Sequence, residues 1–298
     1  MPEDEEGKEA LSLDFQLMME TYGFRIVWGP EMFLTVALAA VFYMRYKGGT
    51  VSRQQMASFF VGLFLLYFAL GGPLNLGGHF WFSIHMLQQS VMYLIVPPLL
   101  LRGMPEGFFR ALSDNPWSRR VILVFGNPIF AMFLFNGAFS FYHIPMIFDA
   151  AMSNYALHNA LHLLLFFSAF ALWWSVFSPA GAIYAMSELK KMGYIFINGI
   201  LLTPACALII FAKAPMYETY TAGAHLLCLP FYAIPVEPVT FSSPWLTPLS
   251  DQQLGGVIMK IMQEISYGCL LGLVFFQWYR REKDKAEDLP DPLLEPTP

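Results

Sequence analysis

The chain has 298 residues and a formal net charge of −5, with 56% hydrophobic, 17% aromatic and only 13% charged residues. Soluble domains carry roughly 25% charged residues, so this chain lacks the polar side chains needed to cover a water-soluble particle of its length. Its basic residues do not gather into a stripe that could bind nucleic acid. The composition therefore predicts an integral membrane protein.

The first element in chain order is an acidic segment, residues 1–29, which begins with Glu3, Asp4, Glu5 and Glu6. It lacks the basic n-region of a signal peptide, so we expect the first hydrophobic span to act as an uncleaved insertion signal. Residues 11–27 are compatible with a helix at the membrane interface, although their amphipathic pattern is weak.

Residues 30–279 contain apolar stretches long enough to cross a bilayer, which takes about 20 residues each. Polar or Pro/Gly-rich segments separate them, and aromatic residues such as Trp81 and Trp278 near their ends suit the membrane interface. We therefore predict an all-α polytopic protein, a bundle of about seven transmembrane helices. The expected spans are residues 30–46, 56–74, 82–101, 120–140, 155–178, 193–213 and 254–279.

The positions of Lys and Arg predict the orientation, because short cytoplasmic loops carry an excess of these residues. Basic residues follow the first, third and fifth spans and fill the tail at 280–298, whereas the loops after the second and fourth spans have none. The amino terminus is therefore expected outside and the acidic tail, residues 280–298, in the cytoplasm. The proline-rich connection at 214–253 is expected to lie across the outer face as a lid or re-entrant segment.

All six histidines fall on the predicted outer side: His79, His85, His143, His158, His162 and His225. His158 and His162 are four residues apart and share one helix face, so their imidazoles can converge on one ion. His85 opens the third span at a similar depth, with Met86 beside it and Gln89 one turn further in. Because imidazole and thioether together suit copper, these residues predict a copper site.

The seventh span carries the other candidates for function. Asp251, Gln252 and Met259 lie near its outer end, where Met259 is a possible soft ligand and Asp251 could orient an imidazole. Gly255-Gly256 allows another helix to approach closely. Lys260 and Glu264 are four residues apart and can pair, and ionisable groups at such depth are expensive.

At these residues the chain resembles the CtaG family of caa-type cytochrome c oxidase assembly factors, polytopic proteins of bacterial plasma membranes. The resemblance covers roughly residues 25–280, and the matching motifs lie at residues 85–88, 96–100, 157–162, 173–174 and 248–259. It implies assistance in forming the CuB centre of the oxidase's catalytic subunit, directly or by passing on copper from a donor protein. Gln89 and Lys260 depart from the family pattern, in which many relatives have His and Trp there.

Other functions remain open from the residues alone. A transporter of a metal ion or small molecule would need charged residues in several spans, and only the seventh clearly has them. Histidines on the third and fifth spans could ligate haem, and a retinal protein is disfavoured because the third span lacks an acidic counter-ion. Motifs of hydrolytic enzymes are missing from the sequence, so we expect a binding protein and not an enzyme.

Overall fold

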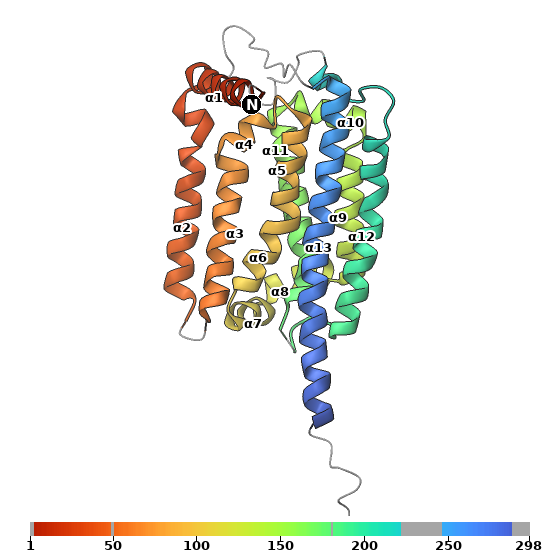
Figure 1. The fold of residues 1–298 in the computed structure, drawn as a ribbon. Coiled ribbons are helices and arrows are strands. Elements are labelled where there is room, and N and C mark those ends of the chain that lie inside the picture. The colour runs from red at the N-terminus through yellow and green to blue at the C-terminus, as the bar shows by residue number, and fades with distance from the viewer. Residues whose placement is uncertain (1–2, 49–50, 180, 222–245, 288–298) are drawn as a thin grey trace, which may run out of the picture.

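The computed structural model describes residues 3–48, 51–179, 181–221 and 246–287, and in this part of the chain every regular element is a helix. Long helices run side by side along one axis, with short helices across both ends of the bundle (Figure 1). The elements are α1 (Glu3–Trp28), α2 (Pro30–Tyr46), α3 (Arg53–Gly71), α4 (Pro73–Gly77), α5 (Phe82–Ser90), η1 (Val91–Ile95), α6 (Val96–Gly103), α7 (Glu106–Asp114), α8 (Pro116–Phe125), α9 (Pro128–Tyr142), α10 (Pro145–Met152), α11 (Tyr155–Phe177), α12 (Glu188–Ile210), η2 (Glu218–Tyr220) and α13 (Pro248–Glu287).

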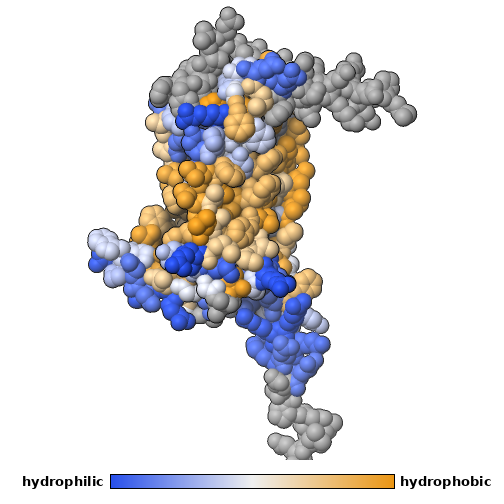
Figure 2. Space-filling model, turned by 90° about the vertical axis from the view of Figure 1, so that its left-hand side faces the viewer, coloured by the Kyte–Doolittle hydropathy of each residue, from blue (hydrophilic) through white to orange (hydrophobic). Residues whose placement is uncertain are grey.

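Six helical stretches in the described residues are long and apolar enough to cross a membrane, and a bent pair makes a possible seventh. Figure 2 shows a belt of hydrophobic side chains between two hydrophilic ends, on the face where α2 lies. The belt exposes large apolar side chains such as Phe33, Leu38 and Phe42. Such a surface is stable only in lipid, so the predicted all-helical membrane bundle is confirmed.

The fourth span differs from the continuous helix expected at 120–140. It consists of α8 and α9, which meet at an angle of 68°. Gly126 ends α8, and the Asn127 side chain accepts hydrogen bonds from the backbone N–H groups of Ile129 and Phe130 at the start of α9. Because Pro128 occupies the first turn of α9 and an Asn cap precedes it, the sequence here starts a new helix instead of continuing the old one.

The third span is also interrupted, by the π-helical turn η1 ahead of Pro97 and Pro98. Neither proline has an N–H group to bond the carbonyl four residues earlier. Those carbonyls instead accept from side chains: Tyr93 from the Trp173 indole at 3.3 Å, and Leu94 from the Ser266 hydroxyl at 2.8 Å. The irregular turn is therefore bonded to α11 and α13, as backbone inside a membrane requires.

The described ends of the chain lie at opposite ends of the bundle (Figure 1). The helix α1 lies across the end of the bundle that also holds α4 and α10. We call this the histidine end, because His79, His85, His143 and His158 lie in or next to the helix ends and connections found there. The far end of α13 extends from the opposite side. Most of the predicted lid at 214–253, with His225, lies outside the described residues, and α13 already begins at Pro248.

Candidate functional site

Three of the predicted ligands lie together in the interior of the histidine end. His85 is on α5, and His158 and His162 are in the first turns of α11. The ring centroids of His158 and His162 are 4.2 Å apart, and those of His85 and His162 are 5.8 Å apart. All three side chains are buried. The structure therefore brings residues from two distant parts of the chain into one imidazole cluster, which we call the histidine cluster (His85, His158 and His162).

The start of α11 positions two of these rings. The Asn154 side chain caps the helix by accepting from the backbone N–H of Leu157, so the helix begins just before His158. Four residues later His162 lies on the same face. The next residue along, Leu163, is 56% exposed on the outside of the bundle. One face of α11 is thus polar and inward, and the opposite face is lipid-facing.

Two polar side chains bridge the cluster. The amide nitrogen of Gln89 lies 2.9 Å from Nε2 of His85, one turn earlier on the same helix. The hydroxyl of Tyr142, at the end of α9, lies 3.2 Å from Nε2 of His162 and 3.5 Å from Nε2 of His85. Tyr142 therefore joins the two imidazoles, and it occupies the space between their Nε2 atoms.

Some buried polar atoms of the cluster have no hydrogen-bond partner in the structure: Nδ1 of His158 and Oε1 of Gln89. Buried polar atoms are usually paired, so such atoms mark a place where a ligand or ion could be accommodated. In the part of the chain described here, however, no three side chains of the His, Cys, Asp and Glu types are already arranged to hold a metal ion. Ligation by all three imidazoles would require side-chain movement, with Tyr142 the first group to move.

The two predicted thioether ligands, Met86 on α5 and Met259 on α13, are both fully buried where these two helices pack together. The single O–H of Ser90 is shared between the backbone carbonyl of Met86, at 2.6 Å, and Sδ of Met259 on α13, at 2.9 Å. A Cβ added at Gly255 would lie 3.1 Å from Cγ of Met86. The close approach predicted for Gly255-Gly256 is confirmed, because Gly256 packs equally closely on Ile209 and Ile210 of α12.

Asp251 holds the start of α5 in place. Its carboxylate accepts from the backbone N–H of Phe82 at 2.6 Å, from the backbone N–H of Ser83 at 3.3 Å and from the Ser83 hydroxyl. These are orphan donors at a helix N-terminus, where a negative charge is favourable. The partners of Asp251 are therefore the first residues of α5 and not an imidazole, and its effect on His85 is exerted through that helix.

Gln252 is next to Asp251 and faces a different segment. Its Oε1 accepts from the backbone N–H of Met216 at 2.6 Å, and its Nε2 is buried and has no hydrogen-bond partner among the described residues. This contact ties the start of α13 to the connection that follows α12.

Two further histidines surround the histidine cluster. The His79 ring is 5.6 Å from that of His158. His143 follows α9, with Nδ1 bonded to the Phe139 carbonyl at 2.8 Å, and its buried Nε2 has no partner in the described part of the chain. Burial lowers the pKa of His143 to about 4, although the bond to Phe139 opposes this shift. At neutral pH, His143 is therefore uncharged.

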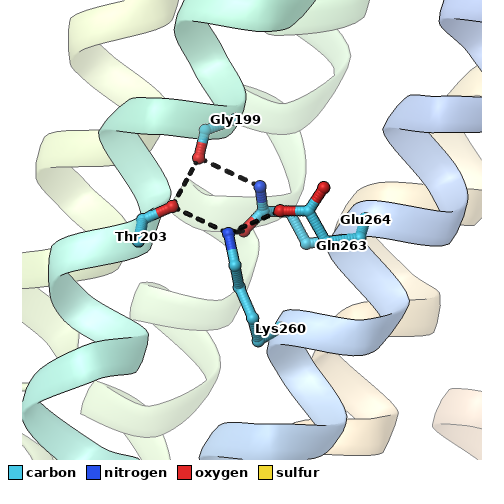
Figure 3. Close-up of polar contacts among 5 residues, drawn as sticks. All are labelled: Gly199, Thr203, Lys260, Gln263 and Glu264. Carbon is cyan, nitrogen blue, oxygen red and sulfur yellow. Dashed lines mark hydrogen bonds and ion pairs between the residues drawn. The ribbon is translucent and has the colours of Figure 1, made fainter.

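Lys260 and Glu264, the remaining predicted residues, form a separate group (Figure 3). Their predicted ion pair is confirmed, with Nζ of Lys260 2.6 Å from Oε1 of Glu264. Lys260 also donates to the Thr203 hydroxyl of α12 at 2.8 Å, so Lys260 bonds to α12 and not to the imidazoles, while Glu264 remains exposed on the outside of the bundle.

The sequence analysis missed Tyr142, whose hydroxyl meets two of the three clustered histidines. Its only signal is a phenol at the outer end of an apolar span, directly before His143. Aromatic residues at such positions are common at membrane interfaces, so this signal does not distinguish an interfacial tyrosine from one in a site.

The fold and the site define a polytopic helical membrane protein with a buried cluster of histidines at one end of its bundle. The chain belongs to the family described as cytochrome c oxidase caa3 assembly factor (Caa3_CtaG), which it matches over residues 35–281.

The chain is also similar to uncharacterised proteins of Mycobacterium bovis and Mycobacterium tuberculosis, each 23% identical over 278 residues. That alignment covers 88% of this chain and 40% of each mycobacterial protein. A Mycobacterium leprae protein is 23% identical over 257 residues, covering 80% of this chain and 36% of the relative. The chain thus spans about two fifths of the length of these relatives. No solved structure matches it.

Proposed function

We propose that this protein assists formation of the CuB centre in the catalytic subunit of the oxidase by binding copper transiently. The observation that supports the proposal is that His85, His158 and His162 are buried together at the histidine end, with the His162 ring 5.8 Å from that of His85 and 4.2 Å from that of His158. Three imidazoles from two helices, with unpaired polar atoms among them, form a donor set that suits copper. Copper is the cargo here and not a resident cofactor.

The chemistry of the cluster favours exchange over permanent binding. In the resting arrangement Tyr142 lies between His85 and His162, so an arriving ion has to displace its hydroxyl. When the ion leaves, the hydroxyl returns to its place beside the two imidazole nitrogens. Met86 and Met259 are candidate soft ligands for Cu(I). To bind the ion, Met259 would give up its contact with the Ser90 hydroxyl, and the contact would form again when the ion leaves. A copper-donor protein on the outer side of the bacterial plasma membrane would supply the ion.

The test replaces two ligands and measures the product of assembly. The variant His158→Ala/His162→Ala should insert normally but yield oxidase lacking most of its CuB copper, measured by metal analysis of the purified oxidase. The matched control is Asn159→Ala/Leu163→Ala, which makes the same i, i+4 change on exposed positions of α11. Normal copper in oxidase from the histidine variant would refute the proposal.

A further inference from the structure

A fourth histidine adjoins the histidine cluster from a different part of the fold. His79 lies in the connection between α4 and α5, and its side chain is buried. Its ring centroid is 5.6 Å from that of His158, nearly the same separation as the 5.8 Å between the rings of His85 and His162. With His158 and His162 4.2 Å apart, the four imidazoles form a continuous row in the order His79, His158, His162 and His85.

The turn that carries His79 is fixed by hydrogen bonds on both sides. The His79 backbone N–H donates to a carbonyl of α4 at 3.0 Å, and the carbonyl of the preceding Gly78 accepts from the Tyr220 hydroxyl at 2.8 Å. Just after the turn, Asp251 binds the first N–H groups of α5. The fold therefore holds the His79 ring in a defined position beside that of His158.

The row contains two pairs of rings with the spacing of a two-coordinate metal site. An ion in line between two imidazoles, about 2 Å from one nitrogen of each, places the ring centroids about 6 Å apart. The separations of His79 from His158 and of His85 from His162 are both close to this value. The rings of His158 and His162 are too close together for an ion in line between them, so they connect the two pairs.

Each pair also has a polar group that a bound ion would satisfy or replace. Nδ1 of His158 is buried and has no hydrogen-bond partner among the described residues. In the other pair, the Tyr142 hydroxyl lies near Nε2 of both His85 and His162, close to the place of an ion bound to those two nitrogens. The described residues offer no ready group of three His, Cys, Asp or Glu ligands. Ligation by two imidazoles at a time therefore fits the row, and it suits Cu(I), which is stable with two ligands.

We propose that His79 is a further copper ligand, and that His79 and His158 form an entry pair from which Cu(I) passes to an inner pair, His85 and His162. This inference rests on the proposed function, because copper is the cargo in both. The ion exchanges its bond to His79 for one to His162, and then its bond to His158 for one to His85. In each exchange one copper–nitrogen bond forms as another breaks, and the ion remains Cu(I).

The positions of the pairs in the bundle give the direction of transfer. His79 lies in a connection at the histidine end, and His158 is in the first turn of α11. His162 is one helical turn, about 6 Å, further along α11 into the bundle. His85 is the most deeply buried of the four side chains. An ion that arrives at the histidine end therefore meets the entry pair before the inner pair.

The test measures Cu(I) uptake by the purified full chain in detergent, without the oxidase. Cu(I) is offered as its coloured complex with bicinchoninate under anaerobic reducing conditions, and the loss of colour gives the rate of uptake and, at equilibrium, the affinity. We expect His79→Gln to slow uptake about tenfold but to change the affinity less than about threefold, because the inner pair remains. His85→Gln should lower the affinity about tenfold or more, while the first phase of uptake stays as fast as in the parent.

Two further variants separate a ligand from a structural residue. His79→Met supplies a thioether, which also binds Cu(I), so its rate of uptake should stay within about threefold of that of the parent. The matched control is His143→Gln, at a buried histidine of the same end whose Nδ1 is bonded to the Phe139 carbonyl, and it should change neither rate nor affinity. Thermal unfolding of each variant must match that of the parent, which excludes misfolding as the cause of a loss.

Three results would overturn the entry pair and leave the copper site of the proposed function standing. These are parental uptake by His79→Gln, equal slowing by His79→Gln and His79→Met, and equal loss of affinity in His79→Gln and His85→Gln. If the parent itself takes up no Cu(I), the proposed function fails together with the entry pair. Failure of the entry pair alone and failure of copper binding are therefore read from different proteins.

Discussion

Two groups of polar side chains lie within the membrane-spanning part of this protein, and they are built in opposite ways. The histidine cluster is buried among α5, α9 and α11, and buried polar atoms at or beside it lack partners among the described residues. The Lys260–Glu264 pair lies on the outside of α13, where the Glu264 side chain is 64% exposed. The difference indicates what each can do, because a buried cluster with spare polar atoms can take up a small ion, whereas the exposed carboxylate is already paired with Lys260.

The largest expected effect compares two glycines of α13. Gly255→Leu should destabilise the protein by more than about 3 kcal/mol, because a Cβ there would lie 2.6 Å from the Phe82 ring. Gly268→Leu should leave stability unchanged or raise it by up to about 1 kcal/mol, since a Cβ there would meet no heavy atom within 4 Å and Leu favours helix over Gly. Thermal unfolding in detergent followed by circular dichroism measures both. Equal losses would show that the outward face is not free.

Two carboxylates of the same helix give the next comparison. Asp251→Ala should cost about 2 to 3 kcal/mol, because it leaves the buried N–H groups of Phe82 and Ser83 without an acceptor. Glu264→Ala should cost less than about 1 kcal/mol, because Lys260 keeps Thr203 and Gln263 as acceptors. Unfolding of the two variants under one set of conditions tests the order, and a larger loss for Glu264→Ala would contradict it.

Acid should weaken the histidine end through His143. Its folded pKa of about 4 lies below the ordinary value of 6.5, so the unfolded chain binds the proton more readily. Stability is therefore complete above about pH 6.5 and falls as the pH drops toward 4, by about 2 kcal/mol at pH 5 for this group. The measurement is the free energy of unfolding of the parent and of His143→Gln across this pH range. The contributions of the other histidines cancel in the difference between the two proteins. If the free energies of unfolding of the two proteins depend on pH in the same way, His143 is not the group that makes the protein sensitive to acid.

The smallest effect is expected at the bridge between the imidazoles. Tyr142→Phe removes the hydroxyl that meets Nε2 of both His85 and His162 and should cost about 1 kcal/mol. The control is Tyr155→Phe, at an exposed tyrosine in the first turn of α11, which should change nothing measurable. Identical melting temperatures for Tyr142→Phe and the parent would show that the Tyr142 hydroxyl does not stabilise the arrangement of His85 and His162.

Hydropathy alone predicted most of the fold, because lipid imposes a minimum length on each apolar helix. It did not predict the break between α8 and α9, since an average over about 20 residues hides a bend made by a few. Asn127-Pro128 is a helix-start signal, but inside an apolar run it is outweighed by the hydrophobic residues around it.

The histidine cluster was predictable only where its residues are local. His158 and His162 share a helix face because of their spacing, and the Lys260–Glu264 pair follows the same rule. The role of Asp251 depends on residues 168 and 169 positions away in the chain, Ser83 and Phe82. Tyr142 depends on how α9 packs beside α5 and α11. No sequence period encodes contacts of that kind, so tertiary packing had to supply them.

The prolines of the third span have a consequence for biosynthesis. Pro98 cannot bond the Leu94 carbonyl, which instead accepts from the Ser266 hydroxyl of α13, 172 residues later in the chain. The cap on α5 also comes from that helix, through Asp251. A nascent chain that ends before α13 therefore lacks both of these partners for polar backbone groups in hydrocarbon, and the third span reaches its final geometry only after α13 has been made.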